Sequence, residues 1–262
     1  LGIEVRQTIW ASSDSSESYV INAKYQIFNK GSKQVADFYI AFWADPDVGG
    51  STDDLVGCDT LQNIFFAYNA TNTDTVYGST PPAWGGKLLV GPMVPSPGDS
   101  AISFGKTVHG YRNLGMSAFS KYINGTDPSS CIHSYNYMRG LNRDGSAYVY
   151  DGNIVRYMNS GDPVAQEGDL DANPADRRLM ASCGPISFNP GDSQEVVFQF
   201  AVARAGDRLT SLSELLHLLR TETPTDVPLV GSDGLPEGFS LNQNYPNPFN
   251  AGTTVEFAIS KP

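Results

Sequence analysis

The sequence predicts an all-β protein: a large β-sandwich with long loops and one packed C-terminal helix, followed by a linker and a single terminal strand. Only 17% of the 262 residues are charged, whereas glycine, proline and aromatic residues, which suit turns and strands, are abundant. Several segments also alternate apolar and polar residues with the period of two of a half-buried strand. The sandwich is expected to span residues 1–222, the linker 223–234 and the terminal segment 235–262.

Three strands are expected at the start of the chain, where they should form a meander. The first spans residues 3–10 and the second spans residues 19–29, in which apolar and polar side chains alternate. A polar turn over residues 12–18 separates them. The third strand, residues 35–43, is rich in aromatic and β-branched side chains.

The middle of the chain, from Asp45 to about Pro185, is expected to be rich in loops. Glycine, asparagine, aspartate and proline recur there at short intervals, between brief apolar pieces. One helical turn is expected near residues 130–139. Regularity returns in residues 194–203, where apolar side chains at every second position predict a core strand.

The best helix candidate is the leucine-rich segment 211–220. Ser211 can cap its start, and Glu214 follows three residues later, as in a capping box. Because leucines cover most of its circumference, this helix is expected to pack firmly onto the sheets. Residues 221–234 contain two prolines and few large apolar side chains, which is typical of a linker.

The chain is strongly acidic, with 17 lysine and arginine residues against 28 aspartate and glutamate residues and a net charge of −11. No basic cluster interrupts the acidity, so neither nucleic acid nor an anionic membrane is an expected partner. No apolar run approaches the roughly 20 residues of a membrane-spanning helix, and no signal peptide opens the chain. The sequence thus predicts no membrane span and, for an exported protein, a mature form.

The three cysteines, Cys58, Cys131 and Cys183, are widely spaced and form no C-x-x-C pair. A zinc ribbon or a thioredoxin-like site is therefore not indicated. One disulfide with one free thiol would fit an oxidising compartment, and three reduced, buried cysteines fit the sequence as well. The spacing does not reveal which pair would form.

The terminal segment 235–262 carries the most specific pattern in the chain, LPEGFSLNQNYPNPFNAGTTVEFAISKP. Its prolines and asparagines predict a turn over residues 244–250, because proline fixes φ and asparagine bonds its own backbone. Residues 253–260 then alternate apolar and polar side chains, which predicts a half-buried strand.

This segment resembles the start of the C-terminal sorting domain carried by cargo proteins of the type IX secretion system, in which FSLNQNYPNPFNP is followed by T-T-I-x-F. Ala251 stands where the pattern usually has proline, and family sorting domains continue for several more strands, so the resemblance implies a truncated sorting segment. It also implies a secreted protein, extracellular or on the cell surface, with the type IX secretion machinery as a partner. The matching motif residues are Phe239, Leu241, Asn244, Tyr245, Pro246, Asn247, Pro248, Phe249 and Asn250.

Three segments of the main body carry a second resemblance. Residues 38–60, 135–148 and 176–209 are similar to blocks shared by large secreted proteins of Bacteroidetes-type bacteria that bear the same sorting tail. The resemblance implies export and a β-rich ectodomain. It supplies no catalytic assignment.

A dense group of carboxylates on a glycine-bent loop suggests a calcium site, because Ca²⁺ takes hard oxygen ligands. Counted from Asp45, the twelfth position is Val56 in place of the bidentate glutamate of an EF-hand, so a generic Ca²⁺ site is predicted, with a solvated acidic loop as the alternative. Asp176, which two arginines follow, is expected to make structural ion pairs. The candidate ligands are Asp45, Asp47, Asp53, Asp54 and Asp59.

Three motifs of the form D-[ST]-apolar resemble the acceptor used for O-glycosylation in Bacteroidetes-type bacteria. The candidate residues are Thr60, Thr75 and Ser100. Ordinary turn chemistry is the alternative reading of these motifs. The resemblance implies a surface glycoprotein.

No catalytic residues are predicted. The chain lacks a G-x-S-x-G elbow, and GDSAISFGKT imitates a P-loop with six residues between its glycines where the motif needs four. Twenty-eight acids always offer carboxylate pairs for glycoside hydrolysis, so such pairs carry no signal without geometry. A cleft with two carboxylates beside Trp43 or Trp84 would indicate a sugar-processing site.

Two functions are therefore expected. The first is a non-catalytic extracellular or cell-surface structural protein, which could form a homo-oligomeric filament by donating its terminal strand to the sheet of a neighbouring copy. The alternative is a secreted polysaccharide-binding module or glycoside hydrolase, with a glycan as the ligand of the aromatic and acidic loops between Asp45 and Pro185.

Overall fold

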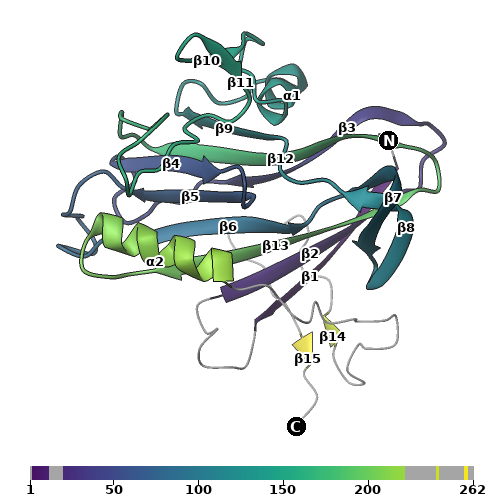
Figure 1. Ribbon diagram of the computed structural model, residues 1–262, viewed down its shortest axis with the longest axis horizontal. Helices are drawn as coiled ribbons and strands as arrows, with labels where there is room; N and C mark the ends of the chain where they lie inside the picture. Colours follow the sequence, from purple (N-terminus) through teal and green to yellow (C-terminus); the bar gives the residue numbers. More distant parts are fainter. Residues whose placement is uncertain (1, 12–19, 222–239, 242–256, 259–262) are drawn as a thin grey trace. The chain divides into compact units, whose positions relative to one another are not determined.

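The protein is described here by a computed structural model (Figure 1). The structure describes residues 2–11, 20–221, 240–241 and 257–258. The chain divides into two compact units, one of residues 1–103 with 107–223 and one of residues 104–106 with 224–262. The described residues are mostly β-strand with two helices, which confirms the all-β prediction.

The larger sheet has six antiparallel strands in the order β1-β2-β13-β6-β5-β4 (Figure 1). The strands are β1 (Ile3–Ala11), β2 (Val20–Asn29), β4 (Asp54–Asp59), β5 (Ile64–Asn69), β6 (Ala83–Val90) and β13 (Ser193–Ala203). The alternation in residues 194–203 correctly predicted β13, a central strand whose Val196 and Phe198 are buried.

The smaller sheet has three strands in the order β3-β12-β9, with β12 antiparallel to both neighbours. They are β3 (Val35–Ala44), β9 (Ala118–Ile123) and β12 (Arg177–Phe188). The expected meander is therefore wrong, because β1 and β2 pair with each other while β3 belongs to the other sheet.

The buried amide of Asn29 holds the crossing from β2 to β3. Its Nδ2 donates to the carbonyl oxygens of Lys33 at 3.0 Å and Phe188 at 2.9 Å, and its Oδ1 accepts a hydrogen bond from the Gly31 amide at 3.0 Å. These bonds satisfy a polar group inside the protein and bend the chain between sheets. A turn that looks like a hairpin in sequence thus becomes an inter-sheet connection.

The expectation of a loop-rich middle is also wrong, since this stretch contains β4, β5, β6, β9 and most of β12. It further holds two small two-stranded sheets, β7 (Met93–Ser103) with β8 (Lys106–Asn113) and β10 (Tyr148–Tyr150) with β11 (Asn153–Val155). Every residue of β5 is buried, because side chains on both of its faces pack against other layers. Such a strand shows no alternation of apolar and polar residues.

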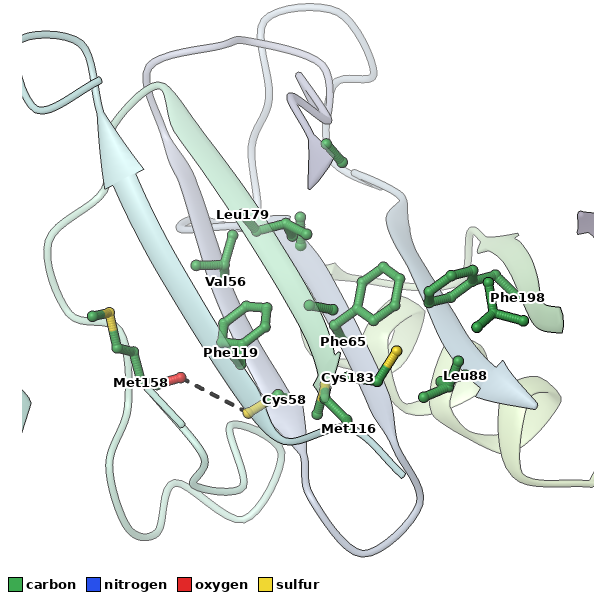
Figure 2. Packing of buried hydrophobic residues seen from close by; sticks show 14 of the residues in the cluster. Val56, Cys58, Phe65, Leu88, Met116, Phe119, Met158, Leu179, Cys183 and Phe198 are labelled. Carbon is green, nitrogen blue, oxygen red and sulfur yellow. Dashed lines mark hydrogen bonds between the residues drawn. The ribbon is translucent and has the colours of Figure 1, made fainter. Parts of the chain in front are cut away.

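The main core lies between the two sheets (Figure 2). Val56 and Phe65 of the larger sheet and Phe119 and Leu179 of the smaller sheet are all at most 1% exposed. Phe198 of β13 joins them in the same cluster. This apolar layer is the principal source of stability that the two sheets share.

Helix α2 (Arg208–Thr221) covers the outer face of the larger sheet (Figure 1). It begins three residues earlier than expected: the Asp207 carboxylate accepts a hydrogen bond from the Thr210 amide at 2.8 Å, and Ser211 Oγ accepts one from the Ala205 amide at 2.9 Å. Asp207 therefore caps the helix in place of Ser211. The expected packing is confirmed by four buried leucines, Leu212, Leu215, Leu216 and Leu219.

Helix α1 (Cys131–Met138) packs on the outer face of the smaller sheet, where the sequence predicted a helical turn. Ser130 caps it, accepting a hydrogen bond from the His133 amide at 3.3 Å. Tyr137 of α1 stacks on Tyr122 of β9, with ring centroids 4.7 Å apart. The sandwich thus carries one helix on each outer face.

Residues 156–159 bridge two neighbouring sheet edges. The Phe119 amide of β9 donates to the Arg156 carbonyl at 3.0 Å, and the Met158 amide donates back to Phe119 at 3.0 Å. On the other side, the Cys58 amide of β4 donates to the Asn159 carbonyl at 3.2 Å, and Cys58 Sγ lies 3.9 Å from the Met158 carbonyl oxygen (Figure 2). This segment closes one side of the sandwich.

All three cysteines are free thiols. Cys58 and Cys183 are buried in the main core, and Cys131 is exposed at the start of α1. Cys58 and Cys183 therefore agree with the alternative of reduced, buried cysteines. Cys131 is also a free thiol but lies at the surface.

Neither helix in the described ranges is long and apolar enough to cross a membrane. In the terminal unit, the described residues form two short antiparallel strands, β14 (Ser240–Leu241) and β15 (Phe257–Ala258). β15 lies inside the strand predicted over residues 253–260, and β14 is an additional strand that the sequence pattern did not predict. The rest of that prediction lies outside the described residues.

The packing of α2 predicts the effect of a cavity at its centre. Leu215 is 0% exposed, so Leu215→Ala should lower the free energy of unfolding by about 2–5 kcal/mol. Urea denaturation followed by circular dichroism measures this loss. Glu214→Ala, at the exposed neighbouring position, is the control and should change stability by less than about 0.5 kcal/mol. Equal stability of the two variants would contradict the packing of α2 on the sheet.

Candidate cation site and ligand groove

Three carboxylates meet where β3 ends and β12 begins. Because β12 runs antiparallel to β3 with Leu179 opposite Ala44, Asp176 comes opposite Asp47 just beyond the ladder. Carboxylate oxygens of Asp45, Asp47 and Asp176 all lie within 4.8 Å of one another. We refer to these three residues as the acidic group.

Arg178 partly neutralises the acidic group. Its Nε lies 3.2 Å from Asp45 and 3.6 Å from Asp127, and its NH1 lies 3.0 Å from Asp176, which confirms the ion pair expected for Asp176. Burial raises the pKa of Asp45, Arg178 opposes this shift, and Asp47 and nearby acids add to it. The carboxylates around Arg178 therefore carry more negative charge than its guanidinium cancels. The oxygens of the acidic group could serve as ligands for Ca²⁺.

The other sequence-predicted calcium ligands lie outside the acidic group. Asp59 accepts hydrogen bonds from the Leu61 and Gln62 amides and pairs with Arg220 of α2 at 2.8 Å. Asp54 is fully buried in β4, and Asp53 precedes it. The structure thus brings together two of the five candidates and adds Asp176, 129 positions after Asp47 (176 − 47), for which the sequence predicted structural ion pairs.

Asp54 is a buried carboxylate that has few hydrogen bonds to offset its loss of hydration. Its Oδ2 accepts a hydrogen bond from the Val48 amide at 3.2 Å, whereas its buried Oδ1 has no hydrogen-bond partner. Burial raises the pKa of Asp54 to about 7, against the lowering effect of the Val48 amide. Below about pH 7 the folded protein therefore favours the protonated, neutral form of this side chain.

A buried ion triad lies beneath β9 and β12. Asp171 Oδ1 lies 2.5 Å from Lys121 Nζ and 2.8 Å from Arg177 NH2, and Asp171 Oδ2 accepts a hydrogen bond from the Val56 amide at 3.2 Å. Burial lowers the pKa of Lys121, and Asp171 opposes that shift. Two cations share one carboxylate, so the triad carries a net positive charge in an acidic protein.

The side chains of this triad lie on the core face of the smaller sheet, with Phe119 and Leu179, and a groove runs along the neighbouring β9 edge toward α1. The groove is open to solvent and has a volume of about 660 Å³. It lies among the C-terminal part of β9, helix α1 and the turn over residues 142–146. Its lining includes Lys121, Tyr122, Tyr137, Asn142, Arg143 and Arg177.

Among the described residues, neither Trp43 nor Trp84 lies beside a pair of carboxylates in a cleft. Trp84 packs into the aromatic core against Phe200, with ring centroids 6.2 Å apart, and Trp43 Nε1 donates to the Tyr122 hydroxyl. A smaller pocket of about 200 Å³ contains Asp59 and Asp162. Both carboxylates there already accept hydrogen bonds from backbone amides of their own turns.

The three glycosylation candidates are all exposed at the surface. Ser100 Oγ lies 2.8 Å from His109 Nδ1 across the β7–β8 pair, and Thr60 and Thr75 lie in turns. The exposure of these three hydroxyl groups is compatible with O-glycosylation, and it fits ordinary turn residues equally well. Of the sorting motif, Leu241 lies in β14, and the other motif residues fall outside the described residues.

No protein-family model matches this sequence, and no curated protein matches it.

The buried Asp54 predicts an unusual pH dependence of stability. An unfolded aspartate titrates near 3.9, so between about pH 4 and pH 7 the folded state binds more protons than the unfolded state. The free energy of unfolding should therefore fall as pH rises through this window and level off above about pH 7. In Asp54→Asn the fall should disappear, making the variant about 1–4 kcal/mol more stable than the wild type at about pH 8.

Urea denaturation in the presence of chelator at several pH values measures this slope. Asp151→Asn changes an exposed aspartate in the same way and should keep the wild-type slope. An unchanged slope in Asp54→Asn would show that another group is responsible.

Calcium binding remains a prediction, and the acidic group sharpens its test. A bound Ca²⁺ stabilises the folded state by mass action, so excess Ca²⁺ should raise the melting temperature and chelator should reverse the rise. Asp176→Asn should abolish the calcium effect, whereas Asp53→Asn, outside the acidic group, should retain it. A wild-type melting temperature that is indifferent to both calcium and chelator would refute the site.

Proposed function

We propose that this chain is a non-catalytic structural protein, exported by the type IX secretion machinery to the cell surface or the extracellular space, that assembles by adding a β-strand to the open edge at β1. The resemblance of the terminal segment to a sorting domain supports the export. The observation that carries the assembly is the state of β1.

β1 is a long edge strand with little protection against pairing. Within the described residues it forms a ladder only with β2. Its nine residues contain no proline, and its two charged side chains, Glu4 and Arg6, pair with each other at 2.6 Å. Natural edge strands usually carry prolines, bulges or inward-pointing charges that prevent association.

Apolar side chains of β1 point to the core face of the sheet but are not covered. In the ladder, Val5 lies opposite Ile27 and Ile9 opposite Ala23, whose side chains are buried. Nevertheless Val5 is 57% and Ile9 60% exposed. An added strand could bury these side chains while its backbone satisfies the outer amides and carbonyls of β1.

The terminal segment has the properties of a donor. The ladder between β14 and β15 contains two residue pairs, Ser240 with Ala258 and Leu241 with Phe257. A two-stranded pair this small is marginally stable alone, and joining a larger sheet would stabilise it. The predicted strand over residues 253–260 is long enough to pair with most of β1.

Complementary variants test the assembly. Ile9→Lys places a charge on the acceptor edge, and Val255→Pro removes a backbone donor from the predicted donor strand. Ile154→Lys alters another exposed apolar position, on β11, and is the control. Light scattering and electron microscopy of the purified full chain should show polymers for the wild type and Ile154→Lys, and monomers for each of the other two variants.

A mixture of Ile9→Lys and Val255→Pro chains adds a diagnostic result. The first chain can still donate and the second can still accept, so the mixture should stop at one-to-one heterodimers. Polymers that persist in either single variant, or a wild-type chain that remains monomeric at all concentrations, would refute strand addition at β1.

A further inference from the structure

We propose that the amine of Lys121 and the carboxyl group of Asp171 condense in the folded protein to an isopeptide bond, a covalent cross-link between the two side chains. The site is the buried ion triad that these residues form with Arg177. This inference does not depend on the proposed assembly, because it concerns chemistry inside a single chain. It rests on the distance between the two groups, their burial and the hydrogen-bond donors around the carboxyl group.

Both side chains lie in the core of the sandwich. In the ladder between β9 and β12, Lys121 stands opposite Leu179, and its side chain points to the same core face as that of Phe119. The Asp171 side chain is 0% exposed and the Lys121 side chain 17%. Charged groups in such a place have lost most of their hydration, so a reaction that removes charge is favoured there.

The reacting atoms are already close to each other. Lys121 Nζ lies 2.5 Å from Asp171 Oδ1. Because a carbonyl C–O bond is about 1.2 Å long, the amine lies within about 3.7 Å of the carboxyl carbon, near the roughly 3–3.5 Å of a productive attack. The fold holds the two groups together, so no encounter from solution is needed.

Two hydrogen-bond donors polarise the Asp171 carboxyl group. The Val56 amide donates to Oδ2 at 3.2 Å, and Arg177 NH2 donates to Oδ1 at 2.8 Å. Both donors stabilise the negative charge that develops on these oxygens when an amine adds to the carbon, as the donors of an oxyanion hole do. Because Val56 lies in β4 of the larger sheet, the packing of the two sheets positions the first donor.

The surroundings of Lys121 favour the neutral amine that the attack requires. Burial lowers the pKa of Lys121, Asp171 opposes this shift, and the positive charge of Arg177 adds to the lowering. A desolvated lysine beside a second cation is the usual form of a nucleophilic lysine. Arg177 therefore serves both groups, since it polarises the carboxyl group and disfavours the charged amine.

The condensation balances without a further reactant. The bond between Nζ and Cγ forms, and the bond between Cγ and Oδ1 breaks. Of the three protons of the ammonium group, one stays on the amide nitrogen and two leave with Oδ1 as a water molecule. Three buried charges are thereby reduced to the one on Arg177, which lowers the desolvation cost of the site.

The cross-link ties the edge strand β9 to the segment that leads into β12. Lys121 and Asp171 are 50 positions apart, so the bond closes a long loop and restricts the unfolded chain as a disulfide does. All three cysteines are free thiols and supply no such link.

Intact mass spectrometry of the purified, fully denatured chain tests the proposal. The wild type should be lighter than its sequence mass by one water molecule. A tryptic digest should contain a branched peptide in which residues 113–139 are joined to residues 157–177, because trypsin does not cleave after a modified lysine. A wild-type chain of full sequence mass would overturn the proposal. Recovery of residues 113–121 and 157–177 as separate peptides would also overturn it, whatever the intact mass.

Variants assign the bond to the Lys121 amine. Lys121→Arg keeps the positive charge without a primary amine, and this chain should have its full calculated mass. Lys87→Arg is the matched control, because burial also lowers the pKa of Lys87 but its amine donates to the Leu219 carbonyl in place of a carboxylate. It should lose one water molecule like the wild type. The same loss in Lys121→Arg would place the modification elsewhere and refute the proposal, and the wild-type mass is a test that does not depend on how the variants fold.

Discussion

The packing of a six-stranded sheet against a three-stranded sheet is the constraint on which the rest of the structure depends. The narrower sheet, centred on β12, covers the middle of the larger one, where Phe65 and Phe198 are buried. The larger sheet must also cover its outer face, and the leucines of α2 do so. Strands between two such layers are buried on both faces, while β1 at the flank keeps an uncovered face.

The two flanks of the sandwich differ for this reason. On one flank, residues 156–159 bond to both β9 and β4 and join the two sheet edges. On the other flank, β1 extends beyond the covering sheet, and among the described residues its ladder contacts are with β2 alone. The covered flank supports the loops that form the groove and the acidic group, whereas the uncovered flank offers backbone groups to another strand. Ligand binding and assembly therefore depend on different flanks of the sandwich.

Sequence patterns predicted the elements whose apolar residues recur with a regular period. Alternating apolar and polar residues revealed β2 and β13, although polar residues of both strands, such as Lys24 and Gln199, are buried as well, and the leucines revealed α2. β5 escaped prediction because its short apolar run shows no alternation, and the separation of β3 from β2 depends on the buried amide of Asn29. The sites depend on pairing between distant segments: the antiparallel register of β3 and β12 brings Asp176 to Asp45, and the turn over residues 142–146 packs on α1 through the bond from Arg143 to His133. Neither the composition of the chain nor the spacing of its residues indicates which distant strands pair or in what register.

Hydrogen exchange of the backbone amides of β1 tests the central claim most directly, that β1 is an open edge that a second copy completes. In the dilute full chain, the amides of β1 that point away from β2 should exchange rapidly, while those of the central strand β13 exchange slowly. At concentrations where the chain assembles, the outward amides of β1 should become protected as β13 remains unchanged. Rapid exchange of these amides at every concentration, or protection already present in the dilute monomer, would contradict the account.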